Sequence, residues 1–147
     1  MQNPVVHDQP INTIQPRTMY QIIKLRREVF GDEQGIGWAI DLDDCDLERN
    51  TRHIWIEIDK KVESYLRLTE ESHSTWKLGR VATRMQFRSQ GFAGRLNRHA
   101  IERLSRKCII TTAEAHLENW YASFDFVPTG STLVIAGITH IEMRHEP

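Results

Sequence analysis

The stretch LGRVATRMQFRSQGFAGRLNRHAIERL, residues 78–104, decides the fold because it joins a strand, a glycine-rich loop and a helix. Side chains alternate along the strand up to Leu78, and the alternation resumes on the opposite parity at Val81. Gly79 stands where the parity changes, and a glycine at such a slip is typical of a β-bulge. We therefore expect a bent strand with unpaired backbone groups at this point.

The loop that follows, residues 88–94, reads Arg-Ser-Gln-Gly-Phe-Ala-Gly, and its small residues let backbone approach a ligand closely. Phe92, Leu96, Ala100 and Leu104 then recur at helical spacing. The first turn of a helix presents free N–H groups and a partial positive charge, which suits phosphate or pyrophosphate. The loop has neither the Gly-Lys-Ser/Thr ending of a Walker A loop nor the GxGxxG fingerprint. The sequence therefore predicts a phosphate-binding loop of another kind.

The composition is that of a single globular domain. The chain has 147 residues, of which 39% are hydrophobic and 27% charged, and its formal net charge is −1. A nearly neutral chain gives no bulk electrostatic reason to expect nucleic acid. No apolar run approaches the ~20 residues of a membrane span, and the N-terminus lacks the pattern of a signal peptide. We expect a cytoplasmic protein that binds neither nucleic acid nor membrane.

The two cysteines, Cys45 and Cys108, form no CxxC pair, and we expect both to be reduced thiols. The seven histidines do not fall into HExxH or similar spacings, so no metal site is predicted.

The N-terminal half begins with residues 1–17, which carry three prolines and are expected to form an arm or a short edge strand before a single domain over 18–147. Thr18-x-x-Gln21 has the spacing of a capping box and predicts the start of a helix that ends at Gly31. An acidic run over 41–48 has two interpretations. It is either a solvated loop, which composition alone favours, or an anionic rim that attracts a cationic amine.

The rest of the chain alternates strands and helices. Residues 53–59 and 62–68 alternate apolar and polar side chains across a tight turn, which predicts an antiparallel hairpin. Residues 108–115 are mostly uncharged and β-branched, and we expect this strand to lie parallel to the bulged one through a right-handed crossover. A short helix and a terminal hairpin follow, over 116–124 and then 131–143. The predicted fold is α/β or α+β with a sheet of mixed direction.

This order of elements resembles the GCN5-related N-acetyltransferase (GNAT) superfamily. The loop is similar to the acyl-CoA loop of that superfamily, Arg/Gln-x-x-Gly-x-Gly/Ala, as Arg88-x-x-Gly91-x-Ala93. The local amino-acid sequence resembles that of the ElaA-type subgroup in several stretches, which cover nearly all of the chain after the arm. They include Leu25-Arg26-x-x-Val29-Phe30, Tyr65-Leu66-Arg67-Leu68, Tyr121-x-x-Phe124-x-Phe126-x-Pro128 and Gly137-Ile138-x-His140-Ile141-x-Met143.

The chain departs from that subgroup at three places. Ser89 and Asp125 stand where glycine is usual. Residues 35–38 replace a Cys-Pro-aromatic motif that contributes to the wall of the substrate site. We expect Ser89 to be tolerated if its φ is negative. Asp125 is expected in a left-handed conformation, which Asp adopts more readily than most residues.

The resemblance implies the GNAT fold, with a bulged strand, a splayed pair of parallel strands and helices on both faces of the sheet. It also implies acetyl-CoA as cofactor, with CoA as product, bound between strands 78–84 and 108–115. The backbone of Val81, Ala82 and Thr83 would then pair with the pantetheine arm. The pyrophosphate would lie on the loop formed by Arg88, Ser89, Gln90, Gly91, Phe92, Ala93 and Gly94.

The resemblance also suggests roles for single side chains. Tyr121 matches the family tyrosine near the thioester sulfur, where a phenol protonates the departing thiolate or simply donates a hydrogen bond to it. His116 is the first candidate for a base or substrate contact, and Glu114 and Glu33 follow it. Without the resemblance, a core tyrosine, a capping histidine and solvated carboxylates would explain these residues. The acceptor-binding carboxylates are expected to be Glu33, Asp41 and Asp43.

The expected function is an acetyl-CoA-dependent N-acetyltransferase, in which an amine attacks the thioester directly in a ternary complex. The alternatives are a non-catalytic CoA-binding or regulatory module on the same fold, and a protein that binds a nucleotide or a phosphorylated sugar at the same helix. The acceptor is expected to be a small-molecule or peptide amine, and a homodimer is compatible with the resemblance.

Overall fold

The computed structural model describes residues 4–147, which form a seven-stranded sheet in the order β1-β2-β3-β4-β5-β7-β6. Of the adjacent strand pairs, β4 and β5 run parallel and the others antiparallel. The prediction of a mixed sheet with a parallel crossover is therefore confirmed. The strands are β1 (Val6–Gln9), β2 (Arg52–Ile58), β3 (Lys61–Glu70), β4 (Thr75–Thr83), β5 (Cys108–Glu114), β6 (Val127–Ile135) and β7 (Ile138–His145).

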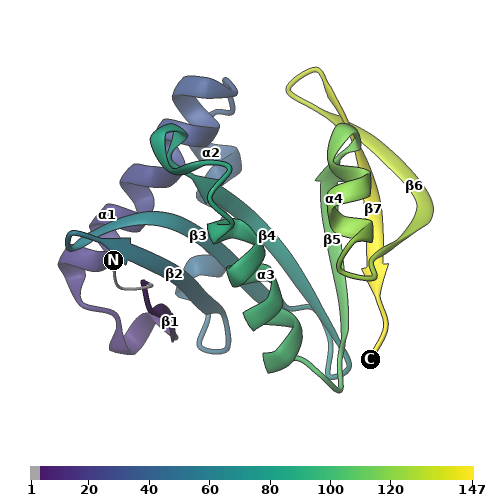
Figure 1. Ribbon diagram of the computed structural model, residues 1–147, viewed down its shortest axis with the longest axis horizontal. Helices are drawn as coiled ribbons and strands as arrows, with labels where there is room; N and C mark the ends of the chain where they lie inside the picture. Colours follow the sequence, from purple (N-terminus) through teal and green to yellow (C-terminus); the bar gives the residue numbers. More distant parts are fainter. Residues whose placement is uncertain (1–3) are drawn as a thin grey trace.

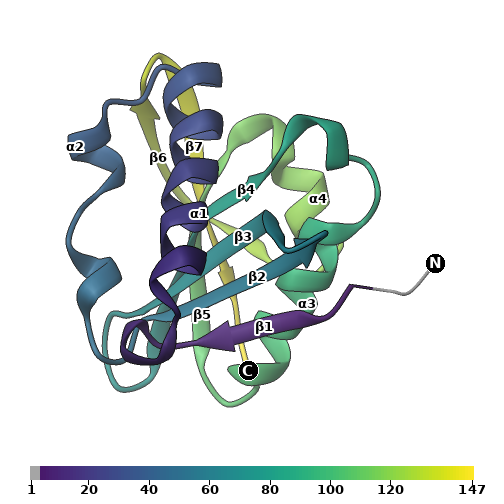
Figure 2. The same cartoon turned by 90° about the vertical axis from the view of Figure 1, so that its left-hand side faces the viewer.

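Helices cover both faces of the sheet, with α1 and α2 on one side and α3 and α4 on the other (Figures 1 and 2). None of the helices within residues 4–147 is both long and apolar enough to cross a bilayer. The helices are α1 (Pro16–Arg26), its π-helical continuation Arg27–Glu33, α2 (Trp38–Asp41), α3 (Phe92–Arg103) and α4 (Glu118–Ala122). Short 3-10 turns lie at Ile11–Thr13, Cys45–Leu47, Met85–Phe87 and Ala115–Leu117.

The sheet separates two hydrophobic cores. The larger lies under α3 and α4, where Leu96 and Tyr121 pack with Leu66, Leu78 and other strand side chains. The smaller lies under α1, whose apolar stripe packs on the other face of β2, β3 and β4. Burying each large aliphatic side chain contributes about 1.5–3 kcal/mol. The two cores fix the sheet between its helical layers, and they hold the ends of β4 and β5 in place.

The predicted β-bulge in β4 is confirmed. Tyr65 of β3 pairs with Ala82, whereas Arg67 pairs with Gly79, so β4 carries one extra residue over this interval. The left-handed residue of the bulge is Arg80, with φ 55°, which directly follows the glycine.

The parallel pairing of β4 with β5 runs from Thr75 opposite Cys108 to Leu78 opposite Thr111 and ends just before the bulge. Beyond this point the two strands part, and the sheet opens into two halves (Figure 1). Beyond Leu78, the β5-facing edge of β4 has no strand partner among residues 4–147.

Local predictions near the helix ends were wrong. The capping box is not formed: α1 begins at Pro16, two residues before Thr18, and the side chain of Gln21 instead accepts a hydrogen bond from the Val62 N–H at 3.0 Å. The helix also passes through Gly31 as a π-helix. A side chain at Gly31 would require the guanidinium of Arg27, which donates to the Ile36 carbonyl, to move.

The C-terminal hairpin is longer than predicted, because β6 begins at Val127 and includes Pro128 and Gly130. Pro128 is tolerated because β6 is the edge strand of the sheet, where a missing N–H breaks no inner ladder. The turn at Ala136-Gly137 is confirmed, with both residues at positive φ. Asp125 has φ 69° and is left-handed, as expected.

Candidate active site

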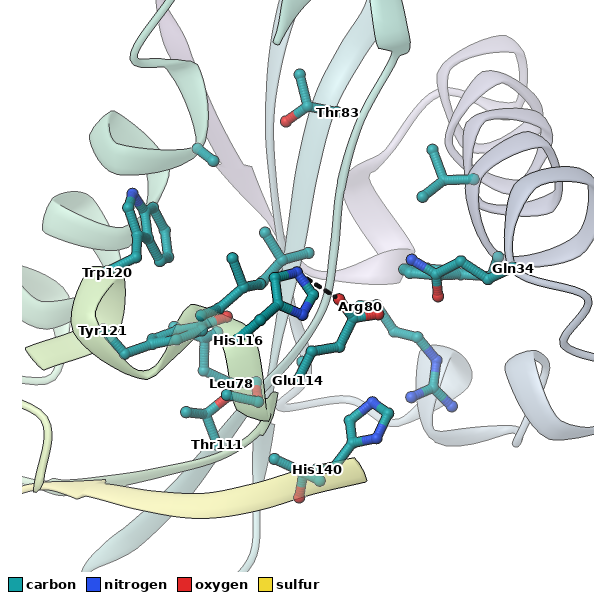
Figure 3. A pocket seen from close by; sticks show the side chains of 18 of the residues that line it. Gln34, Leu78, Arg80, Thr83, Thr111, Glu114, His116, Trp120, Tyr121 and His140 are labelled. Carbon is teal, nitrogen blue, oxygen red and sulfur yellow. Dashed lines mark hydrogen bonds and ion pairs between the residues drawn. The ribbon is translucent and has the colours of Figure 1, made fainter. Parts of the chain in front are cut away.

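A pocket of about 720 Å³ lies where β4 and β5 part. Its walls come from both strands, the loop before α3, the π-helical turn after α1, the segment 34–41, α4 and the β6–β7 hairpin. The close-up shows side chains from these elements meeting around the opening (Figure 3).

Most of the residues predicted from the sequence reach this pocket. Those that line it are Val81, Thr83, Arg88, Ser89, Gly91, Phe92, Ala93, Gly94, Glu33, Asp41, Glu114, His116 and Tyr121. Ala82, Gln90 and Asp43 are not among its lining residues. The Ala82 side chain is buried in the core under α1, and Gln90 is exposed with its amide donating to the Gln86 carbonyl at 3.4 Å.

The loop before α3 places left-handed residues beside the helix N-terminus. Gly91 is the N-cap of α3 with φ 83°, and no acidic side chain occupies the first turn. Ser89 has φ 63°, so the condition of a negative φ, under which serine would be tolerated there, is not met. A serine in this conformation costs more than the glycine usual there, because its Cβ crowds the backbone. The first N–H groups of α3 remain available to an anion.

Arg88 bridges two walls of the pocket. Its Nη2 donates to both carboxylate oxygens of Glu33, at 2.8 and 2.7 Å, and its Nε donates to the Thr83 carbonyl at 2.8 Å. Both side chains of this ion pair are partly exposed. Glu33 thus lies in the pocket with its charge compensated.

Tyr121 lines the pocket from α4 and is 4% exposed. Its ring makes edge contacts with Trp120 and Phe126, at centroid distances of 4.8 and 5.6 Å. Burial raises the pKa of Tyr121 to about 12, although the nearby Thr111 hydroxyl opposes the shift. The phenol is therefore protonated at neutral pH. Full proton transfer from it to a thiolate, whose conjugate acid has a pKa near ~8.5, is uphill, so it serves better as a hydrogen-bond donor.

Glu114 and His116 form a pair on the other side of β5. His116 Nε2 lies 3.3 Å from Glu114 Oε2, and the His116 side chain is 67% exposed (Figure 3). Ala113 belongs to the same core as Tyr121, and side chains alternate along a strand. Glu114 therefore faces away from Tyr121. The pocket is thus lined by the phenol of Tyr121 on one face of β5 and by the Glu114–His116 pair on the other.

Three carboxylates of the acidic run, those of Asp41, Asp43 and Asp46, form an ion-pair network with arginines, which neither the solvated loop nor the anionic rim describes. Arg26 binds Asp41 at 2.8 Å and Asp46 at 2.7 Å, and Arg67 binds Asp46 at 3.1 Å and Asp43 at 2.8 Å. Arg26 is fully buried, and Asp41 and Asp46 are 2% and 6% exposed. Although burial opposes it, the pairing with Arg26 and Arg67 lowers the pKa of Asp46.

Arg80 completes this network from the bulge, 3.2 Å from Asp41 and 3.1 Å from Asp43. The carboxylates of Asp41 and Asp43 are thus committed to guanidinium groups. Their charges thus link separate segments of the chain, and amine binding by Asp41 and Asp43 stays a prediction.

The same arginines fix the acceptor-side wall. Arg80 Nη2 donates to the Ile40 carbonyl at 3.0 Å, and Arg27 Nη2 donates to the Ile36 carbonyl at 2.9 Å. Ile36 and Ile40 line the pocket. This segment contains residues 35–38, whose sequence differs from that of the subgroup. Its backbone is nevertheless anchored by these two hydrogen bonds.

The pocket residues to which the sequence assigned no role in the site include Arg80, Thr111, Trp120 and His140. The glycine at the bulge signalled the position of Arg80, and the ElaA-type stretch around His140 signalled that residue. Nothing in the sequence distinguishes Thr111 from other strand residues or Trp120 from other helix residues. Among residues 4–147 no group of three or more His, Cys, Asp or Glu side chains is placed to hold a metal ion.

Comparisons with known proteins agree with this geometry. The UPF0039 protein Rv2851c of Mycobacterium tuberculosis is 36% identical over 131 residues, which cover 86% of this chain and 83% of the relative. The crystal structure of Escherichia coli ElaA superposes with a TM-score of 0.90 at 26% identity, covering 98% of this chain and 100% of that one. An acyl-CoA N-acyltransferase from Pseudomonas aeruginosa superposes with a TM-score of 0.88 at 26% identity, covering 97% and 99%.

The family model described as an acetyltransferase (GNAT) domain matches residues 42–147, which include β2 to β7, the loop before α3 and Tyr121. The fold expected from the resemblance, with its bulged strand and splayed parallel pair, is confirmed. The chain therefore belongs to the GNAT acetyltransferase family, with ElaA and UPF0039 proteins among its relatives.

Proposed function

We propose that this protein transfers the acetyl group of acetyl-CoA to an amine by direct attack in a ternary complex. The observation that carries the proposal is the pocket between β4 and β5, which joins the loop before α3 to Tyr121 and to the Glu114–His116 pair. Membership of the GNAT family supports acyl transfer in general. The acetyl donor and the amine acceptor are our inference.

The cofactor would occupy the edge of β4 that faces the opening. Val81, Ala82 and Thr83 lie beyond the last parallel pair, so their backbone groups on this edge are available to the pantetheine arm. The side chain of Ala82 points into the core, which does not affect a backbone role. The pyrophosphate would lie on the loop 88–94, where N–H groups of α3 favour an anion.

The reaction needs a proton donor for the thiolate and a proton acceptor for the amine. Tyr121 would donate a hydrogen bond to the departing thiolate from the face of β5 under α4. Glu114 and His116, on the opposite face, would help to carry the amine proton away from the pocket. Glu33, on the same side of the pocket as the acceptor wall, would contact the amine.

The main alternative is a non-catalytic CoA-binding module with the same fold. Such a module would need the loop before α3 but no proton donor at the strand opening. The buried phenol of Tyr121 and the Glu114–His116 pair, both at the pocket, favour catalysis.

The test is an acceptor screen with acetyl-CoA and four amines of different classes: spermidine, kanamycin, lysine and a tripeptide with a free N-terminus. Acetylated product is detected by mass spectrometry, and released CoA is measured as free thiol. The proposal predicts equal amounts of both with at least one amine. CoA binding without product from any amine would favour the non-catalytic module, and absence of CoA binding would contradict both readings.

A further inference from the structure

The imidazole of His140 makes a hydrogen bond to its own strand at the pocket. It lies on β7, is 9% exposed and lines the pocket. Its Nδ1 is 2.8 Å from the carbonyl oxygen of Ile138. In the register of β5 and β7, His140 stands directly opposite Glu114, and the close-up shows it near Glu114 and Arg80 (Figure 3).

This hydrogen bond fixes the tautomer of the imidazole. A carbonyl oxygen only accepts hydrogen bonds, so Nδ1 must carry the proton. A neutral imidazole has one N–H, and the lone pair is therefore on Nε2. Nε2 makes no hydrogen bond to any other group among residues 4–147. The ring is thus a hydrogen-bond acceptor of fixed orientation at the pocket wall.

Charged groups on four elements lie on the same pocket or on the same strand face as this ring. Glu114 faces it from β5 and is paired with His116, and Arg80 extends from β4 while engaged with the acidic network. Glu142 projects from the same face of β7, where the Thr129 hydroxyl donates to its carboxylate at 2.9 Å. Glu33, on the π-helical turn, is compensated by Arg88. Glu114 is the carboxylate that stands opposite a protonated His140.

We propose that His140 Nε2 is the general base that takes a proton from the ammonium form of the acceptor, an inference that rests on the proposed N-acetyltransferase function. The ammonium loses one proton to Nε2 and becomes a free amine. The amine nitrogen then forms a bond to the thioester carbon, and the carbon–sulfur bond breaks. The second amine proton goes to the thiolate, so the products are the acetamide, CoA and one proton.

The Glu114–His116 pair carries the proton from His140 to solvent. Glu114 stands opposite His140 in the strand register, and its carboxylate pairs with His116. His116 is too exposed, at 67%, to hold a fixed orientation towards the substrate, but exposure suits release of a proton. This assigns the two histidines different tasks.

The first test is the pH dependence of kcat/KM with acetyl-CoA and the best of the four amines in the screen. His140→Asn places an amide nitrogen near the position of Nδ1 and removes Nε2. The expected loss in kcat/KM is ~10²–10⁴-fold, with the loss of the limb of the profile in which activity falls on acidification. His116→Gln should keep that limb. His73→Gln, in the exposed turn before β4, is the control for removal of a histidine and should match the parent.

The second test reads the tautomer directly. Long-range ¹H–¹⁵N NMR spectra of the uniformly labelled protein above neutral pH should show an imidazole with Nδ1 protonated and Nε2 unprotonated. Its signals should disappear in His140→Asn, which assigns them. Protonation on Nε2 would overturn the inference.

The kinetic outcomes separate the inference from the proposed function. If the parent acetylates an amine and His140→Asn retains its rate and its acidic limb, His140 is not the base and the function stands. If the parent binds CoA but acetylates no amine in the screen, the proposed function fails and the role of His140 fails with it. The melting temperature and the CoA affinity of His140→Asn should equal those of the parent. A large change in either would assign the loss of kcat/KM to a change in the fold.

Discussion

Arg88 donates through Nη2 to both carboxylate oxygens of Glu33, at 2.8 and 2.7 Å. This ion pair links the loop before α3 to the π-helical turn that follows α1. Because the guanidinium also donates to the Thr83 carbonyl, it is engaged with protein groups on two sides. We infer that the loop would bind pyrophosphate chiefly through backbone N–H groups, with Arg88 holding the walls of the pocket together.

Gly91→Val should therefore weaken CoA binding more than Arg88→Ala. Gly91 has φ 83°, a conformation that a β-branched residue adopts only at a cost, although a Cβ there would meet no atom within 4 Å. The strain should move the first N–H groups of α3 and weaken binding by tenfold or more, at ~1.4 kcal/mol per tenfold. Calorimetric titration with CoA measures both variants. A Gly91→Val protein that binds CoA like the parent would exclude a backbone-based loop.

Tyr121→Phe should lower kcat while leaving the fold and CoA affinity intact. The ring packing against Trp120 and Phe126 is retained, and only the donor is removed. Because the raised pKa of the phenol makes full proton transfer unfavourable, the loss should lie near ~10²-fold, the low end for general acid–base catalysis. The loss should be equal in kcat and kcat/KM, since the interaction is made in the transition state.

Steady-state kinetics with the best acceptor, beside a thermal melt, checks this. A near-parental kcat at unchanged melting temperature would assign Tyr121 to core packing alone.

Asp46→Asn should destabilise the protein strongly. Asp46 contacts both Arg26 and Arg67, and its loss would leave the fully buried Arg26 guanidinium with one compensating carboxylate instead of two. Breaking a buried ion pair typically costs ~3–5 kcal/mol. Asp44→Asn is the matched control, because Asp44 is exposed and Asn tolerates its left-handed φ of 66°. Urea denaturation compares the two, and equal stabilities would show that the network contributes nothing.

Acidification should destabilise the fold in two stages. Burial lowers the pKa of His53, whose ring atoms contact the Tyr65 hydroxyl at 2.7 Å and the Asp46 carbonyl at 3.0 Å. The unfolded chain therefore binds a proton at His53 before the folded chain does, and stability falls as pH drops through ~6.5. The lowered pKa of Asp46 acts in the same direction, with its contribution lost further down, below ~3.9.

The measurement is the urea midpoint between pH 7.5 and 5. His53→Asn should show a flatter dependence, because the group that gains a proton on unfolding is gone. A parental midpoint that stays constant or rises on acidification would contradict this account of the buried histidine.

The elements that could be predicted from the sequence are those set by local patterns. The bulge in β4 was marked by Gly79 at a change of parity, and the hairpin of β2 and β3 by strict alternation. The loop before α3 was marked by its glycines. In each case the deciding residues are neighbours along the chain.

The parts that could not be predicted depend on partners distant in sequence. The capping box failed because Gln21 bonds to Val62, which follows it by 41 residues. The ion-pair network of the acidic run could not be predicted because Arg26, Arg67 and Arg80, which neutralise its carboxylates, come from three separate elements. His140 acquires its place beside Glu114 only because β7 inserts between β5 and β6, an order that no local pattern specifies.

The most direct test of the central claim is a thermal melt with acetyl-CoA, CoA, ATP or NAD at the same concentrations. A ligand at one hundred times its dissociation constant stabilises the folded state by about 2.7 kcal/mol, which raises the melting temperature by several degrees for a chain of this size. A pocket built for acyl-CoA predicts such a rise with acetyl-CoA and CoA, and little or none with ATP or NAD. No rise with acetyl-CoA, or an equal rise with ATP, would contradict the assignment of the opening between β4 and β5 as an acyl-CoA site.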